Sequence, residues 1–272
     1  MHESRLAVRP PRASGVSSRP GPGRWFIGVN LAWSERNRSG VAILRGDRSG
    51  LELVRSGTAA AIEEIAGWIR PLPGDWWIAI DAPLVVNNRC GRRASDAAIS
   101  RLYQRFDAGA HPTNLTILRN RVRGGELVQA LSADRVRIVD ALPRAGARGR
   151  QAFEAYPHAG MVELFGLDRI VKYKRGRVAE RRAGQNELAS LLRRRLPQLD
   201  PPLRLNADLS RLLRTPDPAL RGGALKSRED ELDAAFCAYL AAHLWAWGRS
   251  RQRLLGDPSD GVVVLPAVRA DV

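Results

Sequence analysis

The feature that most constrains the fold of this chain is an uninterrupted apolar run, residues 76–80, that ends at the carboxylate Asp81. Short continuous apolar runs are typical of strands covered on both faces, as in parallel sheets flanked by helices. In such α/β sheets, ligands gather beyond the carboxyl ends of the strands. The run therefore predicts a central strand that brings Asp81 to a functional edge. In an alternative interpretation, Asp81 only caps the loop that follows.

Three segments before this strand predict an antiparallel meander. Residues 25–29, 40–44 and 51–54 are rich in apolar side chains, and short polar turns separate them. Links this short cannot cross over a sheet, so consecutive strands are expected to be antiparallel neighbours. A helix capped by Thr58 and stopped before Pro71 is expected to lead into the central strand.

Apolar spacing predicts six further elements after the central strand. They are helices at 94–106, 121–131, 186–196 and 227–247, a short strand at 152–156 and an edge strand at 261–265. Residues 197–223 show no clear period, so no structure is predicted for them. A chain of 272 residues fits one domain. We expect this domain to span residues 24–272, with insertions around 107–150 and 166–226.

Composition narrows the expected partners and compartment. A formal net charge of +16 favours binding to a polyanion, and nucleic acid is the expected partner. A genome that favours arginine codons explains the charge equally well. Residues 1–23, rich in Pro, Arg, Ser and Gly, are expected to form a flexible basic segment. Cys90 and Cys237 are too distant in sequence to suggest a disulfide framework, and no apolar segment is long enough to span a membrane, so a cytoplasmic location is expected.

Carboxylates at apolar positions are the strongest functional signal. Glu154 lies in a short apolar strand, where an unpartnered carboxylate would cost several kcal/mol. Asp233 falls within the apolar sector of the last predicted helix, and Asp230 lies one turn earlier. Buried acids that converge repel one another unless a cation or protons intervene, and oxygen ligands suit Mg²⁺ or Mn²⁺. Asp81, Glu154, Asp230 and Asp233 are therefore predicted to be metal ligands and catalytic residues, although a salt bridge with an arginine remains an alternative for Glu154.

Two other acids of this helix have a different expected role. Glu229 and Glu231 lie beside the predicted ligands in sequence but on other faces of the helix. We expect them to face solvent and to interact favourably with the helix dipole.

Basic residues near the acids are predicted to contact substrate. Arg89, Arg92 and Arg93 follow the Asp81 loop and could bind a phosphate through charge-assisted hydrogen bonds, or could form an ordinary solvated start to a helix. His158, after Pro157, could shuttle a proton or serve only a structural role.

A second basic set surrounds Tyr173. Lys172, Lys174 and Arg175, together with Lys226, could follow a nucleic-acid backbone while Tyr173 stacks on a base. A simple charged loop is the alternative. Both interpretations are compatible with the sequence.

Four motifs, in order along the chain, resemble those of a known family. They are Gly28-Val29-Asn30-Leu31-Ala32-Trp33, Ile80-Asp81-Ala82-Pro83-Leu84, Phe153-Glu154-Ala155-Tyr156-Pro157-His158 and Asp230-Glu231-Leu232-Asp233-Ala234-Ala235. Together they resemble the DUF429 proteins, predicted nucleases of the ribonuclease H-like superfamily. The resemblance implies an α/β fold with a mixed five-stranded sheet, three antiparallel strands first, flanked by helices. It also implies a metal-dependent hydrolase site at the centre of the sheet.

Asn30 departs from the pattern of this superfamily. The resemblance implies an aspartate there that bridges two metal ions, so Asn30 takes a catalytic position without its charge. Two hypotheses follow: a metal-dependent nuclease with weakened activity, in which the cation activates a water, or an inactive nucleic-acid-binding module. Asn30 could also simply hydrogen-bond the adjacent strand end. An actin-like phosphotransferase is disfavoured because residues 34–38 do not resemble a glycine-rich phosphate loop.

Overall fold

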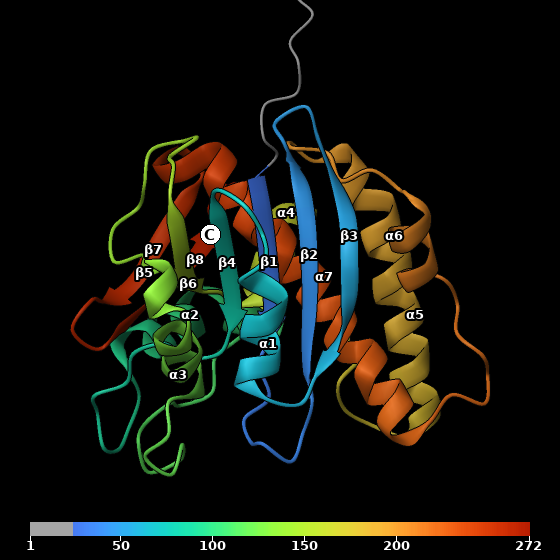
Figure 1. Ribbon diagram of the computed structural model, residues 1–272. Coiled ribbons are helices and arrows are strands. Elements are labelled where there is room, and N and C mark those ends of the chain that lie inside the picture. The colour runs from blue at the N-terminus through green and yellow to red at the C-terminus, as the bar shows by residue number, and fades with distance from the viewer. Residues whose placement is uncertain (1–23) are drawn as a thin grey trace, which may run out of the picture.

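The structure is a computed structural model that describes residues 24–272, so the basic segment predicted at 1–23 lies outside the described residues. A mixed eight-stranded sheet forms the centre, in the order β3-β2-β1-β4-β6-β8-β7, with β5 paired to β6 (Figure 1). The strands are β1 (Arg24–Asn30), β2 (Ser39–Asp47), β3 (Gly50–Ala59), β4 (Trp76–Asp81), β5 (Arg137–Ile138), β6 (Arg150–Glu154), β7 (Gln252–Asp257) and β8 (Gly261–Pro266).

Helices cover both faces of this sheet. They are α1 (Ile62–Ile69), α2 (Ala94–Tyr103), α3 (Arg123–Ala130), α4 (Pro157–Phe165), α5 (Val178–Arg195), α6 (Ala207–Leu212) and α7 (Gly222–Trp247). Short 3-10 turns add η1 (Gln104–Phe106), η2 (Ser132–Asp134), η3 (Leu196–Gln198) and η4 (Gly248–Ser250). None of the helices within residues 24–272 combines the length and the apolar character needed to cross a membrane.

The mixed α/β sheet flanked by helices and its opening meander are confirmed, because β1 pairs with β2 and β2 with β3, both antiparallel. The expected number of five strands is wrong. β8, the segment predicted as an edge strand, is not at the edge but lies between β6 and β7. β7 is the edge strand, and it forms an antiparallel hairpin with β8. β7 escaped prediction because its residues mix polar and apolar side chains without a clear alternation.

Helix boundaries differ from the prediction at several points. Thr58 lies in β3, and the helix expected to start there begins at Ile62. α4 was not expected, although Pro157 at its first position suits a helix start. The region without predicted structure contains α6.

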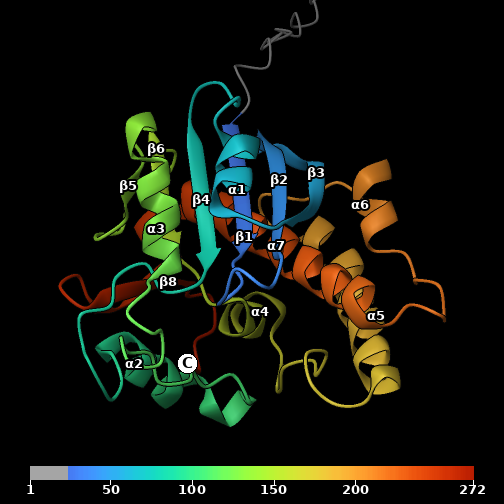
Figure 2. The ribbon, with the colours of Figure 1, turned by 60° about the horizontal axis from the view of Figure 1, so that its bottom comes forward.

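Parallel pairing brings three strand ends to one edge of the sheet. β4 runs parallel to β1, with Asn30 opposite Asp81, and parallel to β6, with Ile80 opposite Glu154. In Figure 2, which turns this edge forward, β4 ends close to α4. The side chains at this edge therefore come from segments far apart in the sequence.

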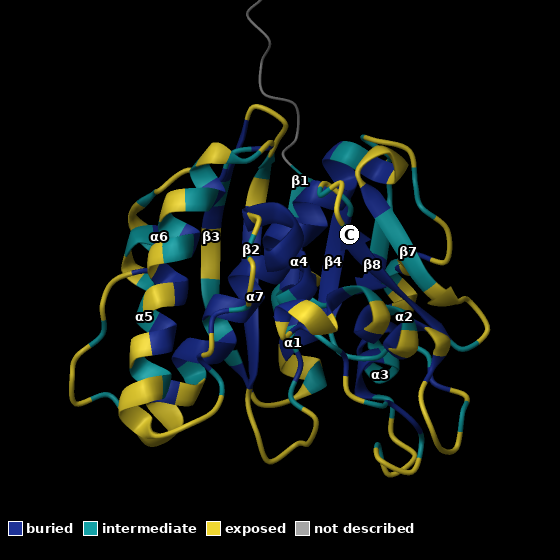
Figure 3. Cartoon of the chain, turned by 180° about the vertical axis from the view of Figure 1, so that it is seen from behind, coloured by how far each residue is buried: buried dark blue, intermediate teal, exposed yellow. Residues whose placement is uncertain are grey.

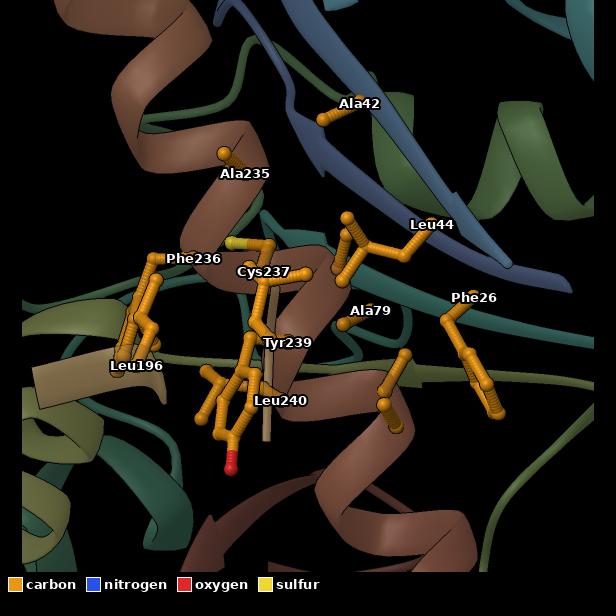
Figure 4. Packing of buried hydrophobic residues seen from close by; sticks show 14 of the residues in the cluster. Phe26, Ala42, Leu44, Ala79, Leu196, Ala235, Phe236, Cys237, Tyr239 and Leu240 are labelled. Atoms are coloured by element: carbon orange, nitrogen blue, oxygen red, sulfur yellow. The ribbon is translucent and has the colours of Figure 1, made fainter. Parts of the chain in front are cut away.

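Helix α7 packs directly on the sheet. A Cβ added to Gly28 in β1 would lie 1.9 Å from the carbonyl oxygen of Ala234, and one on Gly40 in β2 would lie 2.0 Å from that of Asp230. Figure 4 shows the resulting layer, in which Leu44 and other sheet residues face the side chains of α7. Only glycine permits such close approach, so these two positions set where α7 can place its acids.

Buried apolar residues form a separate cluster on each face of the sheet. Figure 3 shows α7 buried along almost its whole length, whereas the outer side of α5 is exposed. α1 and α3 cover the opposite face of the sheet with a second apolar cluster. α7 is consequently an internal helix, which changes what its charged residues must do.

Candidate functional site

A cavity of about 880 Å³ lies at the sheet edge where β1 and β4 end. Asn30 and Asp81 line it from the strand ends, and Asp230 lines it from α7. The connection between α4 and α5, residues 166–177, contributes Lys174. Three of the predicted catalytic residues therefore face one space, together with a lysine from the predicted basic set.

Asp233, on α7, lies beside this cavity and is fully buried, with 0% of its surface exposed. The Lys174 Nζ lies 2.9 Å from Asp233 Oδ2 and 3.9 Å from Asp81 Oδ2. Tyr173 donates its hydroxyl to Asp233 Oδ1 at 2.5 Å, and Asn30 Nδ2 donates to Oδ2 at 3.2 Å. Burial opposes the charge of Lys174, but Asp233 and Asp81 outweigh it and hold the lysine pKa well above its ordinary value.

Asp81 is the least satisfied of these acids. Among the described residues, the contact of its side chain with a cation is the 3.9 Å approach of Lys174, and no hydrogen bond to its carboxylate is present. Burial raises the pKa of Asp81 to about 6; Lys174 lowers it, and Asp233 raises it further. A carboxylate with a strongly shifted pKa in a cleft is a candidate for function.

Asp230 is held from two sides. Lys226 Nζ lies 2.5 Å from Asp230 Oδ1, and Asn30 Nδ2 donates to the same oxygen at 3.0 Å. Burial raises the pKa of Asp230 to about 6, although the hydrogen bond from Lys226 opposes the shift. Asn30 thus bonds two acids of α7, and not the neighbouring strand end as the structural alternative proposed.

The expected exposure of Glu229 and Glu231 is wrong. Glu229 is 2% exposed and pairs with Lys226 at 2.8 Å and Arg181 at 3.2 Å. Glu231 is partly buried and accepts a hydrogen bond from Ser56 at 2.9 Å. Both are shielded from solvent because α7 is buried along most of its length, which helical periodicity alone does not reveal.

Glu154 does not join the other acids, because an arginine occupies both of its oxygens. Arg93, 2% exposed, donates to them at 2.6 and 2.9 Å, and Leu84 N donates at 3.1 Å. Arg93 also binds Asp96 at 2.9 Å. The salt bridge that remained open as an alternative is therefore the arrangement found, and Arg93 lies inside the protein with no surface to offer a phosphate.

The other predicted substrate contacts divide into two groups. Lys172, Lys226 and His158 line the cavity with Lys174, whereas Arg89 and Arg92 do not. Lys172 is paired loosely with Asp107 at 3.4 Å. Burial lowers the pKa of His158 to about 3, with Lys174 adding to the effect, so the imidazole is neutral at neutral pH.

The structure assigns a different role to the predicted stacking residue. Tyr173 is 1% exposed and its hydroxyl is bound to Asp233, so it cannot stack on a base. Trp33, by contrast, is 61% exposed and lines the cavity. Sequence reasoning overlooked it, although its place in a polar turn directly after the first strand was a signal.

Searches of the curated proteins and of the solved structures found no match. A family model described as a protein of unknown function, DUF429, matches residues 28–259. That range includes the carboxyl ends of β1, β4 and β6 and every acid described above, and the chain therefore belongs to the DUF429 family.

Proposed function

We propose that the cavity is the active site of a ribonuclease H-like, metal-dependent hydrolase that acts on phosphodiester bonds. The observation that carries this proposal is the convergence of Asp81, Asp230 and Asp233 on one sheet edge beside Asn30. Buried acids placed this close are tolerated when cations or protons offset their charge. The basic side chains of the cavity add an attraction for phosphate.

The sheet supports the same proposal. The order β3-β2-β1-β4-β6 begins with antiparallel pairs and continues with parallel ones, as the resemblance to ribonuclease H-like proteins implies. β8 and β7 extend this set at one side. Asp81 lies at the carboxyl end of the parallel strand β4, with Asp230 and Asp233 of α7 nearby, and this is the edge where α/β sheets bind ligands.

The donor set suits one divalent cation. Residues 24–272 hold no group of three or more acid, imidazole or thiol side chains arranged for a metal. Mg²⁺, however, is often held by one or two carboxylates together with waters and substrate phosphate. The ammonium of Lys174 between Asp233 and Asp81 is a stand-in for such a cation. Asp81 and Asp233 would hold Mg²⁺ or Mn²⁺ once Lys174 moves away.

Such a cation, when bound, would lower the pKa of a coordinated water and offset charge on the leaving oxygen. The chain's own residues would keep the acids in place. Asn30 donates to both Asp230 and Asp233, and Tyr173 fixes the second oxygen of Asp233. Lys172, exposed in the cavity lining, is suited to bind the phosphate.

A nucleic-acid-binding module without turnover is the second candidate. It is favoured by Asn30, which stands where the resemblance implies a metal-bridging aspartate, and by the ion pair that already neutralises Asp233. In this case the cavity would bind phosphate without cleaving the chain.

The test incubates purified protein with Mn²⁺ or Mg²⁺ and end-labelled single-stranded, duplex and hybrid oligonucleotides. We expect cation-dependent cleavage that is lost in Asp81→Asn and kept in Asp208→Asn, a control on the exposed surface of α6. Binding without cleavage, unchanged by Asp81→Asn, would refute the hydrolase and favour the module. Absence of binding to every substrate would refute both.

A further inference from the structure

Trp33 is an exposed aromatic side chain at the cavity. The other large apolar side chains exposed within the described part of the chain are aliphatic: Val54, Ile117, Val178, Leu205 and Val268. A single exposed apolar residue is ordinary and needs no explanation by itself. Trp33, however, lines the proposed active site beside the acids and lysines, and this position does require an explanation.

Other tryptophans near the surface are covered by arginines. The guanidinium of Arg55 lies 3.4 Å from the ring centroid of Trp68, and that of Arg251 lies 3.6 Å from the ring of Trp247. Within residues 24–272, no arginine, lysine or aromatic ring stacks on Trp33 in this way. Its ring therefore presents an open π surface to the cavity.

The loop that carries Trp33 is nevertheless well anchored. Three contacts hold it: Ala32 N donates to Ser39 Oγ at 3.1 Å, Arg38 Nε donates to Thr58 Oγ1 at 2.7 Å, and Arg121 Nη1 pairs with Glu35 Oε1 at 2.9 Å. An aromatic ring on an anchored loop loses little conformational entropy when a ligand stacks on it. The loop is thus suited to binding a flat group.

The charges of the cavity point to the nature of that group. Lys172 is largely exposed, and Arg175 contacts the imidazole of His111 at 3.2 Å but pairs with no carboxylate of residues 24–272. An open aromatic ring combined with basic side chains is typical of single-strand nucleic-acid binding, in which bases stack and phosphates meet cations. Bases within a duplex are already stacked on each other and cannot reach such a ring.

We infer that Trp33 stacks on an unpaired base of a single-stranded nucleic acid whose phosphates contact Lys172 and Arg175. This inference rests on the proposed function for the choice of ligand and adds the form of nucleic acid that the cavity takes. It assigns to Trp33 the stacking role that the sequence had suggested for Tyr173.

The test measures binding in EDTA, so that no cleavage occurs, by anisotropy of a labelled single strand and of its duplex, in both DNA and RNA. We expect the single strand to bind more tightly than the duplex. Trp33→Ala should weaken single-strand binding at least about tenfold, whereas Trp33→Phe should keep it within about threefold. Leu205→Ala, an exposed apolar control between η3 and α6, should bind as the wild type.

The outcomes separate this inference from the proposed function. Equal binding by Trp33→Ala and wild type, or tighter binding of the duplex, overturns the inference even if cleavage with Mn²⁺ is found. Loss of single-strand binding in Trp33→Ala without any metal-dependent cleavage supports the inference and refutes the hydrolase. Circular dichroism of each variant confirms folding, which we expect because the Trp33 side chain is mostly exposed.

Discussion

Replacing Arg93 with methionine should destabilise the protein far more than the same change at its neighbour Arg92. Arg93 is buried and binds Glu154 and Asp96, which are buried as well. Its removal leaves two carboxylates inside the protein without a cation. Arg92 is exposed, and its side chain donates one hydrogen bond, to Ser100 Oγ at 3.1 Å.

The size of the effect follows from these contacts. Breaking a buried ion pair by removing one partner costs about 3–5 kcal/mol. Backbone N–H groups still donate to both acids, from Leu84 to Glu154 and from Thr113 to Asp96, so the lower part of that range is expected. Arg92→Met should cost less than about 0.5 kcal/mol, as is usual for surface substitutions.

The loss should also depend on pH. Burial already holds the pKa of Glu154 above its ordinary value of 4.5, with Arg93 opposing the shift. Without Arg93 the pKa of the folded state rises further. A carboxyl group whose pKa is raised by folding stabilises the protein at low pH, and this contribution is lost as pH rises through the folded-state pKa. The deficit of Arg93→Met should therefore be smaller at pH 5 than at pH 8.

Urea denaturation followed by circular dichroism at both pH values measures these differences. Equal losses for the two arginine variants, or a loss below about 1 kcal/mol for Arg93→Met at pH 8, would refute the reasoning. If Arg93 instead bound phosphate, its replacement would weaken oligonucleotide binding and leave the unfolding free energy unchanged.

Three further predictions concern the site and its support. Lys174→Met should bind Mn²⁺ about tenfold more tightly than the wild type by calorimetry, because the ammonium no longer competes for the two carboxylates; equal affinity would contradict the proposed cation position. Asp81→Asn should raise the unfolding free energy by about 1–2 kcal/mol at pH 8 and little at pH 4, since burial raises the pKa of this acid from 3.8 to about 6 and its ionisation above that pH opposes folding. Gly28→Ala should cost more than about 3 kcal/mol in the same urea denaturation assay because its Cβ would meet the α7 backbone, whereas Gly67→Ala in α1, with open space around it, should be neutral or stabilising.

Local pattern sufficed for the opening meander, the central strand and the position of Asp81 at its end. Each of these depends on residues close together in the sequence, whose apolar spacing reflects burial against a sheet. The two acids of α7 were predicted for the same reason, since helical periodicity places them on the side facing the sheet edge. The sequence by itself therefore determined the class of fold and three of the acids beside the cavity.

Tertiary structure alone decided which side chain each acid binds. Glu154 binds Arg93, 61 residues earlier, and Asp233 binds Tyr173, 60 residues earlier. Such pairs depend on how the loops pack around the sheet, and the apolar periodicity of the sequence does not show which residues these loops bring together. Burial makes the choice matter, because an acid shielded from water must find its partner within the protein.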